Sequence, residues 1–146
     1  MAIMIPSKPR FYTPESKENL IFESLEKLSD AYYVVHSFDN VCTIEKSFRE
    51  HECDFVVFHP NKGIIFIEVK ATHIKYENGT WFYANGTEMK YGGPYEQANM
   101  NKRHLLQQVT ENIRRNCKFL HAVWFPLMSL SEIKTLPPEA DKSIKK

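Results

Sequence analysis

The sequence predicts a single α/β domain built on a mixed sheet, in the order helix, three strands, hairpin, helix and strand. An amphipathic segment near the N-terminus is followed by three segments rich in β-branched and aromatic residues. Two Asn-Gly dipeptides then interrupt the sheet, and a second amphipathic segment precedes a last short apolar strand. The length of 146 residues matches one domain of ordinary size.

The N-terminal part combines an extended lead-in with the first helix. Residues 1–15 contain three prolines, which favour an extended chain. Apolar residues then recur at helical spacing between Leu20 and Leu28, which predicts a helix over residues 16–29. Ser16 is the residue type and position expected for its N-cap.

The three strands are expected over residues 32–38, 53–58 and 64–70. The polar residues 39–50 indicate a loop between the first two strands, and residues 60–63 carry the proline, asparagine and glycine typical of a turn. The third strand is almost continuously apolar, which favours a central position covered on both faces.

A hairpin insertion and the C-terminal elements complete the order. Asn78-Gly79 and Asn85-Gly86 are flanked by strand-forming residues and are strong hairpin signals. A long helix is expected over residues 95–117, followed by a strand over 121–125. The predicted domain thus covers residues 16–126.

Residues 127–146 carry two adjacent prolines and end in basic residues. We expect a tail, or a linker to a further domain of a longer chain.

Composition excludes several classes of protein. Hydrophobic residues make up 42% of the chain, which suffices for a core, and no apolar run has the roughly 20 residues of a membrane helix. The net charge is only +1, so the total charge indicates no polyanion partner. Cys42, Cys53 and Cys117 form no metal-binding or disulfide pattern, which favours reduced thiols and a cytoplasmic location without membrane contact.

Charged residues interrupt the ends of the second and third predicted strands. Glu52 and Asp54 lie two positions apart, as do Glu68 and Lys70, so each pair shares one face of its strand. A short turn joins the two strands, which makes them antiparallel neighbours. Asp54 and Glu68 are therefore expected to converge, with Lys70 beside them.

This convergence has two interpretations. Glu68 and Lys70 alone would usually form an exposed ion pair where a strand leaves the core. Two carboxylates from neighbouring strands, however, form an oxygen site that suits Mg²⁺ or Mn²⁺ together with water and a substrate phosphate. A neighbouring lysine would orient or deprotonate a water, or stabilise developing negative charge.

The pattern Asp54, thirteen residues, Glu68-x-Lys70 resembles the signature of the PD-(D/E)XK nuclease superfamily. The segments 52–60, 63–70 and 94–98 around it are similar to the nuclease-related domain (NERD) family. Cys53 stands where the superfamily signature has proline. The resemblance implies a restriction-endonuclease-like αβββαβ core and hydrolysis of DNA phosphodiesters by a Mg-activated water.

The resemblance also implies roles for individual residues. Asp54 and Glu68 would bind the metal, Lys70 would be the catalytic lysine, and Gln97 would complete the catalytic set beside them. Glu18, in the first helix, would be a further metal ligand, directly or through water.

Glu52 is a secondary candidate, and simpler interpretations remain open for three of these residues. Glu18 and Gln97 are ordinary residues for the first turn of a helix, and Glu52 also suits an exposed strand edge.

A local excess of basic residues suggests DNA contact. Six basic and two acidic residues lie between residues 90 and 118, a net charge of +4. Lys102, Arg103, Arg114 and Arg115 are the candidate DNA-binding residues, although a solvated helix face would look the same. Aromatic residues of the insertion would stack on bases or pack the hairpin onto the core, and packing is favoured for Trp81.

The leading interpretation is a Mg-dependent endonuclease or nickase acting on DNA, in repair or defence. The alternatives are a nucleic-acid-binding module with weak or no catalysis, which recruits a helicase or other DNA-processing partner, and an interaction domain with an incidental Glu-x-Lys. The number of metals stays open, as does the choice of DNA or RNA as substrate. A homodimer would suit cleavage of both strands.

Overall fold

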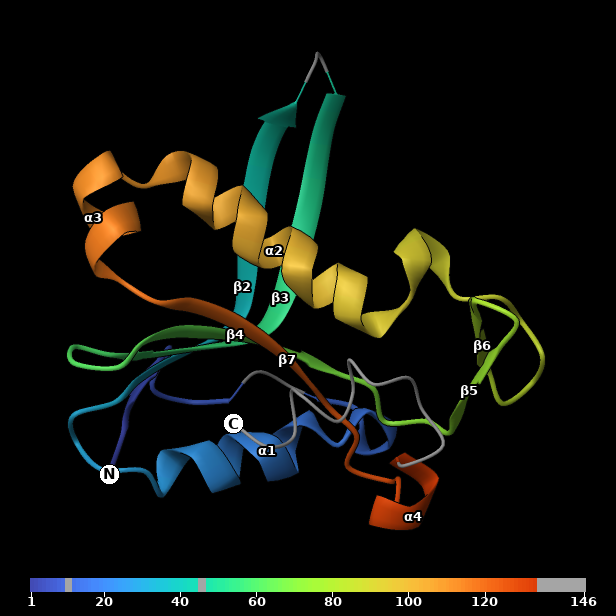
Figure 1. Ribbon diagram of the computed structural model, residues 1–146. Coiled ribbons are helices and arrows are strands. Elements are labelled where there is room, and N and C mark those ends of the chain that lie inside the picture. The colour runs from blue at the N-terminus through green and yellow to red at the C-terminus, as the bar shows by residue number, and fades with distance from the viewer. Residues whose placement is uncertain (10–11, 45–46, 134–146) are drawn as a thin grey trace.

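The computed structural model describes residues 1–9, 12–44 and 47–133 and shows a five-stranded mixed sheet between helices (Figure 1). In spatial order the strands are β1 (Ile3–Ile5), β2 (Tyr33–Ile44), β3 (Ser47–His59), β4 (Gly63–Val69) and β7 (Phe119–Trp124). β5 (Ile74–Glu77) and β6 (Thr80–Tyr83) form a separate hairpin. The helices are α1 (Glu18–Glu26), α2 (Pro94–Gln108), α3 (Glu111–Asn116) and α4 (Leu130–Ile133), with 3-10 turns at η1 (Pro14–Ser16) and η2 (Lys90–Gly92).

Strand directions confirm the predicted mixed sheet of a restriction-endonuclease-like fold. β2, β3 and β4 pair antiparallel, whereas β1 on β2 and β7 on β4 pair parallel. The crossover from β4 to β7 passes through the β5–β6 hairpin and α2. Within the described ranges, no helix combines the length and the apolar character needed to cross a bilayer.

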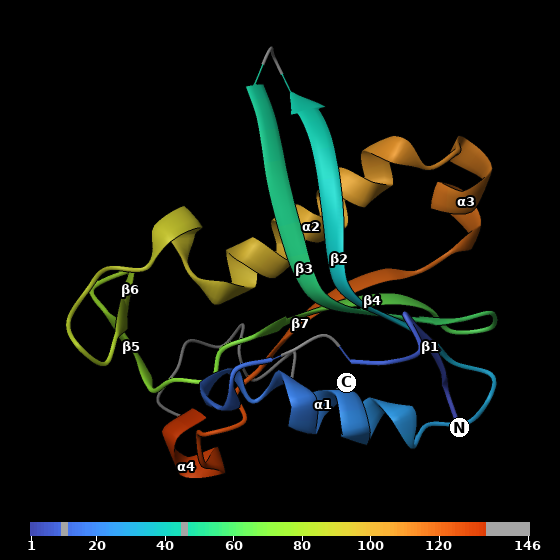
Figure 2. The same ribbon diagram turned by 180° about the vertical axis from the view of Figure 1, so that it is seen from behind.

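Two apolar layers cover the sheet, one on each face (Figures 1 and 2). Phe55 and Ile67 point to the side of α1 and pack against its buried residues, among them Phe22. Val56 and Phe66 point to the opposite side, where Leu105 of α2 packs against them. Alternation along β3 and β4 therefore supplies both cores, as expected for central strands.

The β5–β6 hairpin packs against α2 and the end of β7. Trp81 is 7% exposed and lies in a cluster with Tyr95 and Phe125. A Cβ at Gly93 would lie 2.3 Å from the Trp81 ring, so only glycine allows the indole to sit at the start of α2. The expectation that Trp81 packs rather than stacks on bases is confirmed. The turn at Asn78-Gly79, with both φ values positive, closes the hairpin as predicted.

The lead-in was not fully predicted, because it contains the short parallel strand β1. Its three residues are too few to show a pattern. Nearby, the buried His36 ring forms a hydrogen bond with the Tyr12 hydroxyl at 2.7 Å and with the Pro6 carbonyl oxygen at 2.9 Å. These two contacts fasten the lead-in to β2.

The predicted loop over residues 39–50 is wrong, because β2 and β3 continue through it as one antiparallel ladder. Pairing extends from Tyr33 opposite Phe58 to Ile44 opposite Ser47. This polar segment forms a strand because hydrogen bonds across the ladder satisfy its backbone N–H and C=O groups. Its side chains show no apolar pattern that would have predicted the strand.

The long helix predicted over residues 95–117 is also wrong, since it is two helices. Val109 and Thr110 adopt extended conformations, with ψ of 156° at each residue, and separate α2 from α3. Both residues are β-branched and favour extended backbone. The helical period continues across the break, so periodicity alone does not reveal it.

The first helix begins later than predicted, and Ser16 is not its N-cap. Lys17 occupies that position in a left-handed conformation, with φ of 58°. Ser16 instead ends the preceding 3-10 turn, where its hydroxyl donates to the Thr13 carbonyl at 2.9 Å.

The expected tail includes the short helix α4, whereas residues 134–146 lie outside the described residues. A capping box fixes α4: the Ser129 N–H donates to Glu132 Oε2 at 2.7 Å, and the Glu132 N–H donates to Ser129 Oγ at 3.3 Å.

We expect Gly63→Ala to lower the free energy of unfolding by about 3 kcal/mol or more. Gly63 has φ of +108°, and a Cβ there would lie 2.3 Å from the Lys118 carbonyl oxygen, which accepts the Ile64 N–H at the start of the β4–β7 pair. Gly79→Ala is the matched control, because φ is +79° but nothing lies within 4 Å. Gly79→Ala should lower the free energy of unfolding only by the backbone strain, about 1 kcal/mol. Urea unfolding measures both, and equal losses would contradict this account.

Candidate active site

The site begins with the register between β3 and β4. Phe55 lies opposite Ile67, so Asp54 and Glu68 are the next residues on the two strands. Asp54 Oδ2 accepts a hydrogen bond from the Val69 N–H at 2.7 Å. The half-buried carboxylate of Asp54 is thereby held against the end of β4. The structure thus brings together the two carboxylates that the sequence predicts to converge.

Lys70 completes this group from the end of β4. Its ammonium lies 3.1 Å from Glu68 Oε1, and the two side chains are only 15% and 11% exposed. The Lys70 N–H donates to the Trp124 carbonyl at 3.0 Å, which fixes the backbone of the lysine against β7. The pair is therefore not the exposed ion pair of the simpler interpretation. Withdrawing two charges from water costs free energy that an apolar pair would avoid, so an arrangement of this kind suggests function.

Cys53, at the position of the superfamily's proline, is a buried structural thiol. It is 1% exposed, and its S–H is shared between the carbonyl oxygens of Phe55 and Ile67. Burial, reinforced by the negative charges of Asp54 and Glu68, raises the pKa of Cys53 far above its ordinary value. The thiol therefore stays protonated and is not suited to act as a nucleophile or a metal ligand.

Gln97 and Glu18 lie at the starts of two helices on opposite sides of the sheet (Figure 2). Gln97 is in the first turn of α2, and its side-chain amide donates to the Lys90 carbonyl at 3.1 Å, which joins η2 to the helix. Glu18 is the half-buried first residue of α1. Their catalytic and metal-binding roles stay predictions. Glu52 lies within β3, but its side chain is outside the part of the chain that the structure describes.

The donor set of Asp54 and Glu68 fits a hard divalent cation. Across residues 1–9, 12–44 and 47–133, no group of three or more His, Cys, Asp or Glu side chains is arranged to hold a metal ion. Mg²⁺ usually needs only one or two carboxylates, because water and substrate phosphate fill its other positions. The two carboxylates therefore suffice for Mg²⁺ but not for a tetrahedral zinc site.

The candidate DNA-binding residues lie on two helices and not on one stripe. Arg103 of α2 pairs with Glu96 of the same helix, and Arg115 of α3 pairs with Glu111. Lys102 is half-buried, and burial, with a smaller effect of Arg103, lowers its pKa. These ion pairs use the two acidic residues already counted in the local net charge of +4, so they leave that charge unchanged and engage Arg103 and Arg115.

His121 lies close to the charged residues Lys102 and Glu96, and no pattern in the sequence singles it out. It lies on β7 opposite Phe66, on the strand face that packs against α2. Burial lowers the pKa of His121, Lys102 lowers it further, and Glu96 partly offsets these effects. Only the packing of α2 on β7 brings these charges to the histidine, so no local sequence signal marks it.

A second histidine follows the Glu-x-Lys strand. His73 Nδ1 lies 3.1 Å from Glu132 Oε1, so the loop after β4 contacts the capping residue of α4. Hydrogen bonds from the backbone and side chain of Ser129 lower the pKa of Glu132, and the charge of His73 adds to this effect.

A mixed sheet between α1 and α2, with a carboxylate from each of two neighbouring strands at one end, defines a restriction-endonuclease-like α/β domain. Residues 14–126 match the family model described as the nuclease-related domain, NERD. The chain therefore belongs to the nuclease-related domain family, which indicates a nuclease-related function and nucleic acid as partner. Searches of curated proteins and of solved structures returned no match.

We expect Lys102→Gln to raise the pKa of His121, because a positive charge that opposes protonation is removed. Glu96→Gln should lower the pKa of His121 below its value in the wild-type protein. NMR titration of the His121 ring measures both shifts, with Lys75→Gln on the distant β5 as control. The unfolded chain binds the proton of His121 more readily than the folded chain does. The free energy of unfolding therefore decreases as pH falls through the ordinary histidine range. A His121 pKa unchanged in both variants would contradict this cluster.

Proposed function

We propose that this protein is a metal-dependent nuclease that hydrolyses DNA phosphodiester bonds. The observation that carries the proposal is the convergence of Asp54, Glu68 and Lys70 at one end of the β3–β4 pair, with the Glu68–Lys70 pair largely withdrawn from solvent. Membership in the nuclease-related domain family supports it.

The three side chains have distinct roles in this proposal. Asp54 and Glu68 would hold Mg²⁺ or Mn²⁺, which when bound activates a water and neutralises charge on the scissile phosphate. The hydrogen bond from the Val69 N–H occupies Asp54 Oδ2, which orients the other oxygen of the carboxylate. Lys70, with its ammonium 3.1 Å from Glu68 Oε1, would donate to a phosphate oxygen or receive a proton from the attacking water. Gln97, at the start of α2, would complete the catalytic set. Glu18, at the start of α1, would be a further metal ligand, directly or through water.

Nicking of supercoiled plasmid in Mg²⁺ or Mn²⁺ tests the role of Lys70. Lys70→Met should lower the nicking rate by about 100-fold or more, the usual effect of losing a general acid–base group. The matched control is Lys75→Met, an exposed lysine of β5, which should leave the rate unchanged. Thermal unfolding of both variants shows whether the loss arises from the chemistry or from the fold. Nicking that survives Lys70→Met with an intact fold would refute the proposed role.

Titration calorimetry with Mn²⁺ tests the metal site separately from catalysis. Asp54→Asn keeps the shape of the side chain and an oxygen to accept the Val69 N–H, but removes the charge. We expect it to weaken Mn²⁺ binding at least tenfold, whereas Asp30→Asn, in an exposed turn, should not. Equal Mn²⁺ affinity in both variants would remove Asp54 from the metal site.

The same experiments distinguish the proposed nuclease from a recruitment module, in which the domain locates a helicase or other partner on DNA. That alternative predicts DNA binding without nicking and without dependence on metal, Asp54 or Lys70.

A further inference from the structure

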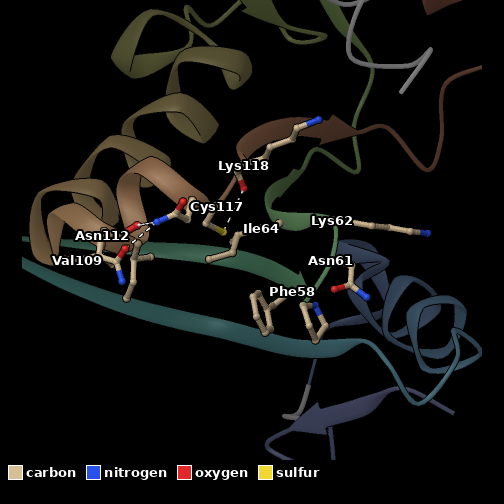
Figure 3. A pocket seen from close by; sticks show the side chains of 12 residues that line it. Phe58, Asn61, Lys62, Ile64, Val109, Asn112, Cys117 and Lys118 are labelled. Carbon is tan, nitrogen blue, oxygen red and sulfur yellow. Dashed lines mark hydrogen bonds between the residues drawn. The ribbon is translucent and has the colours of Figure 1, made fainter.

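A cavity of about 740 Å³ lies between α3 and the β3–β4 turn, at the opposite end of the sheet from Asp54 and Glu68 (Figure 3). Its size is typical of ligand pockets in proteins, which span roughly 300–1,000 Å³. The described contacts of the carboxylate site do not involve it. Neither the sequence nor the family match assigns it a role.

The interior of this pocket is apolar and includes one aromatic ring. The apolar lining includes Phe58 of β3, Ile64 of β4, and Val109 and Ile113, with Val109 preceding α3. The half-buried Phe58 packs at 6.0 Å from the Tyr33 ring and presents a fixed aromatic surface. An apolar wall with an aromatic ring suits a flat, uncharged group.

The polar residues of the pocket are mainly amides and lysines, and within the described part of the chain no acidic residue lines it. Asn61, Asn112 and Asn116 supply side-chain amides that can donate and accept hydrogen bonds. Lys62 and Lys118 extend away from the pocket in Figure 3, and Lys62 lies over the Tyr32 ring with its ammonium donating to the Tyr32 hydroxyl at 2.8 Å. The uncharged lining thus lies inside, and the positive groups lie at the rim.

The pocket also lies on the same sheet face as the proposed active site. Ile64 and Glu68 are four positions apart on β4 and point to the same side, about 13 Å apart along the strand. Leu105 of α2 packs on Phe66 between them, so a chain joining the two sites crosses α2, which carries Lys102 and Arg103. α2 thus carries two basic residues, and Arg114 of α3 follows the pocket-lining Ile113 in sequence.

We propose that this pocket binds an unpaired nucleobase of the nucleic-acid substrate, while Lys62 and Lys118 at its rim contact the adjoining phosphates. The inference rests on the proposed function, because it makes the pocket an anchoring site for the strand that the carboxylate site would cleave. Stacking on Phe58 would supply affinity with little sequence preference, since every base has an aromatic face.

Fluorescence anisotropy in EDTA tests this without cleavage. The two probes are a labelled single-stranded oligothymidylate and an abasic strand of equal length, which has the same phosphate charge but no bases. The protein should bind the oligothymidylate about tenfold more tightly than the abasic strand, as expected for loss of one stacked base.

Two variants assign that preference to the pocket. Phe58→Leu removes the ring but keeps an apolar side chain, and Ile113→Trp fills the cavity from a position that is 45% exposed. Both should abolish most of the preference without changing the slope of affinity against salt, whereas Arg114→Gln should reduce that slope by about one. Leu127→Trp, at a 43% exposed position outside the pocket, is the matched control and should retain the preference.

The outcomes separate this inference from the proposed function. A preference that survives both Phe58→Leu and Ile113→Trp overturns the pocket assignment, whether or not the protein nicks plasmid. A protein that binds neither strand at low salt overturns both the inference and DNA as the substrate. Loss of the preference together with retained plasmid nicking supports a base-binding site distinct from the catalytic residues.

Discussion

The pairing of β3 with β4 is the constraint on which the candidate site depends. Its register brings Asp54 level with Glu68, and the Val69 N–H binds the Asp54 carboxylate just beyond the last paired residues. A slip of one residue would turn Glu68 and Lys70 toward the apolar layer of α1, where their charges would have no water. The register that buries the apolar residues correctly is thus the register that assembles the carboxylates.

The layers on both sides keep this pairing fixed. α1 covers one face and α2 the other, while β7 binds the far edge of β4 and accepts the Lys70 N–H. Trp81 packs on Gly93 and joins the hairpin to the start of α2. The backbone that carries Glu68 and Lys70 is therefore held by α1 and α2 on the two faces of the sheet and by β7 at its edge. This is the preorganisation that a site for charged ligands requires.

Local patterns predicted those parts of the fold that depend on neighbouring residues. Alternation placed Glu68 and Lys70 on one face, and the Asn78-Gly79 dipeptide gave the hairpin. The remaining features depend on tertiary contacts. The β2–β3 ladder runs through a polar segment, and α2 ends at Val109 although the helical period continues. The approach of Lys102 to His121 and the pocket beside α3 arise only when helices pack on the sheet, so no spacing in the sequence indicates them.

The long β2–β3 ladder has a consequence for local stability. β1 pairs with β2 only over Tyr33–Val35, and β4 pairs with β3 only from Phe55 onward, so among the described strands none borders the rest of the ladder. Figure 1 shows this part as an arm that projects from the sheet. Two-stranded ribbons are marginally stable by themselves, and such units open below the free energy of global unfolding. Opening of the arm ends where β4 begins to pair. Asp54 lies one residue outside this limit, so the hydrogen bond from the Val69 N–H to its carboxylate joins the base of the arm to the end of β4.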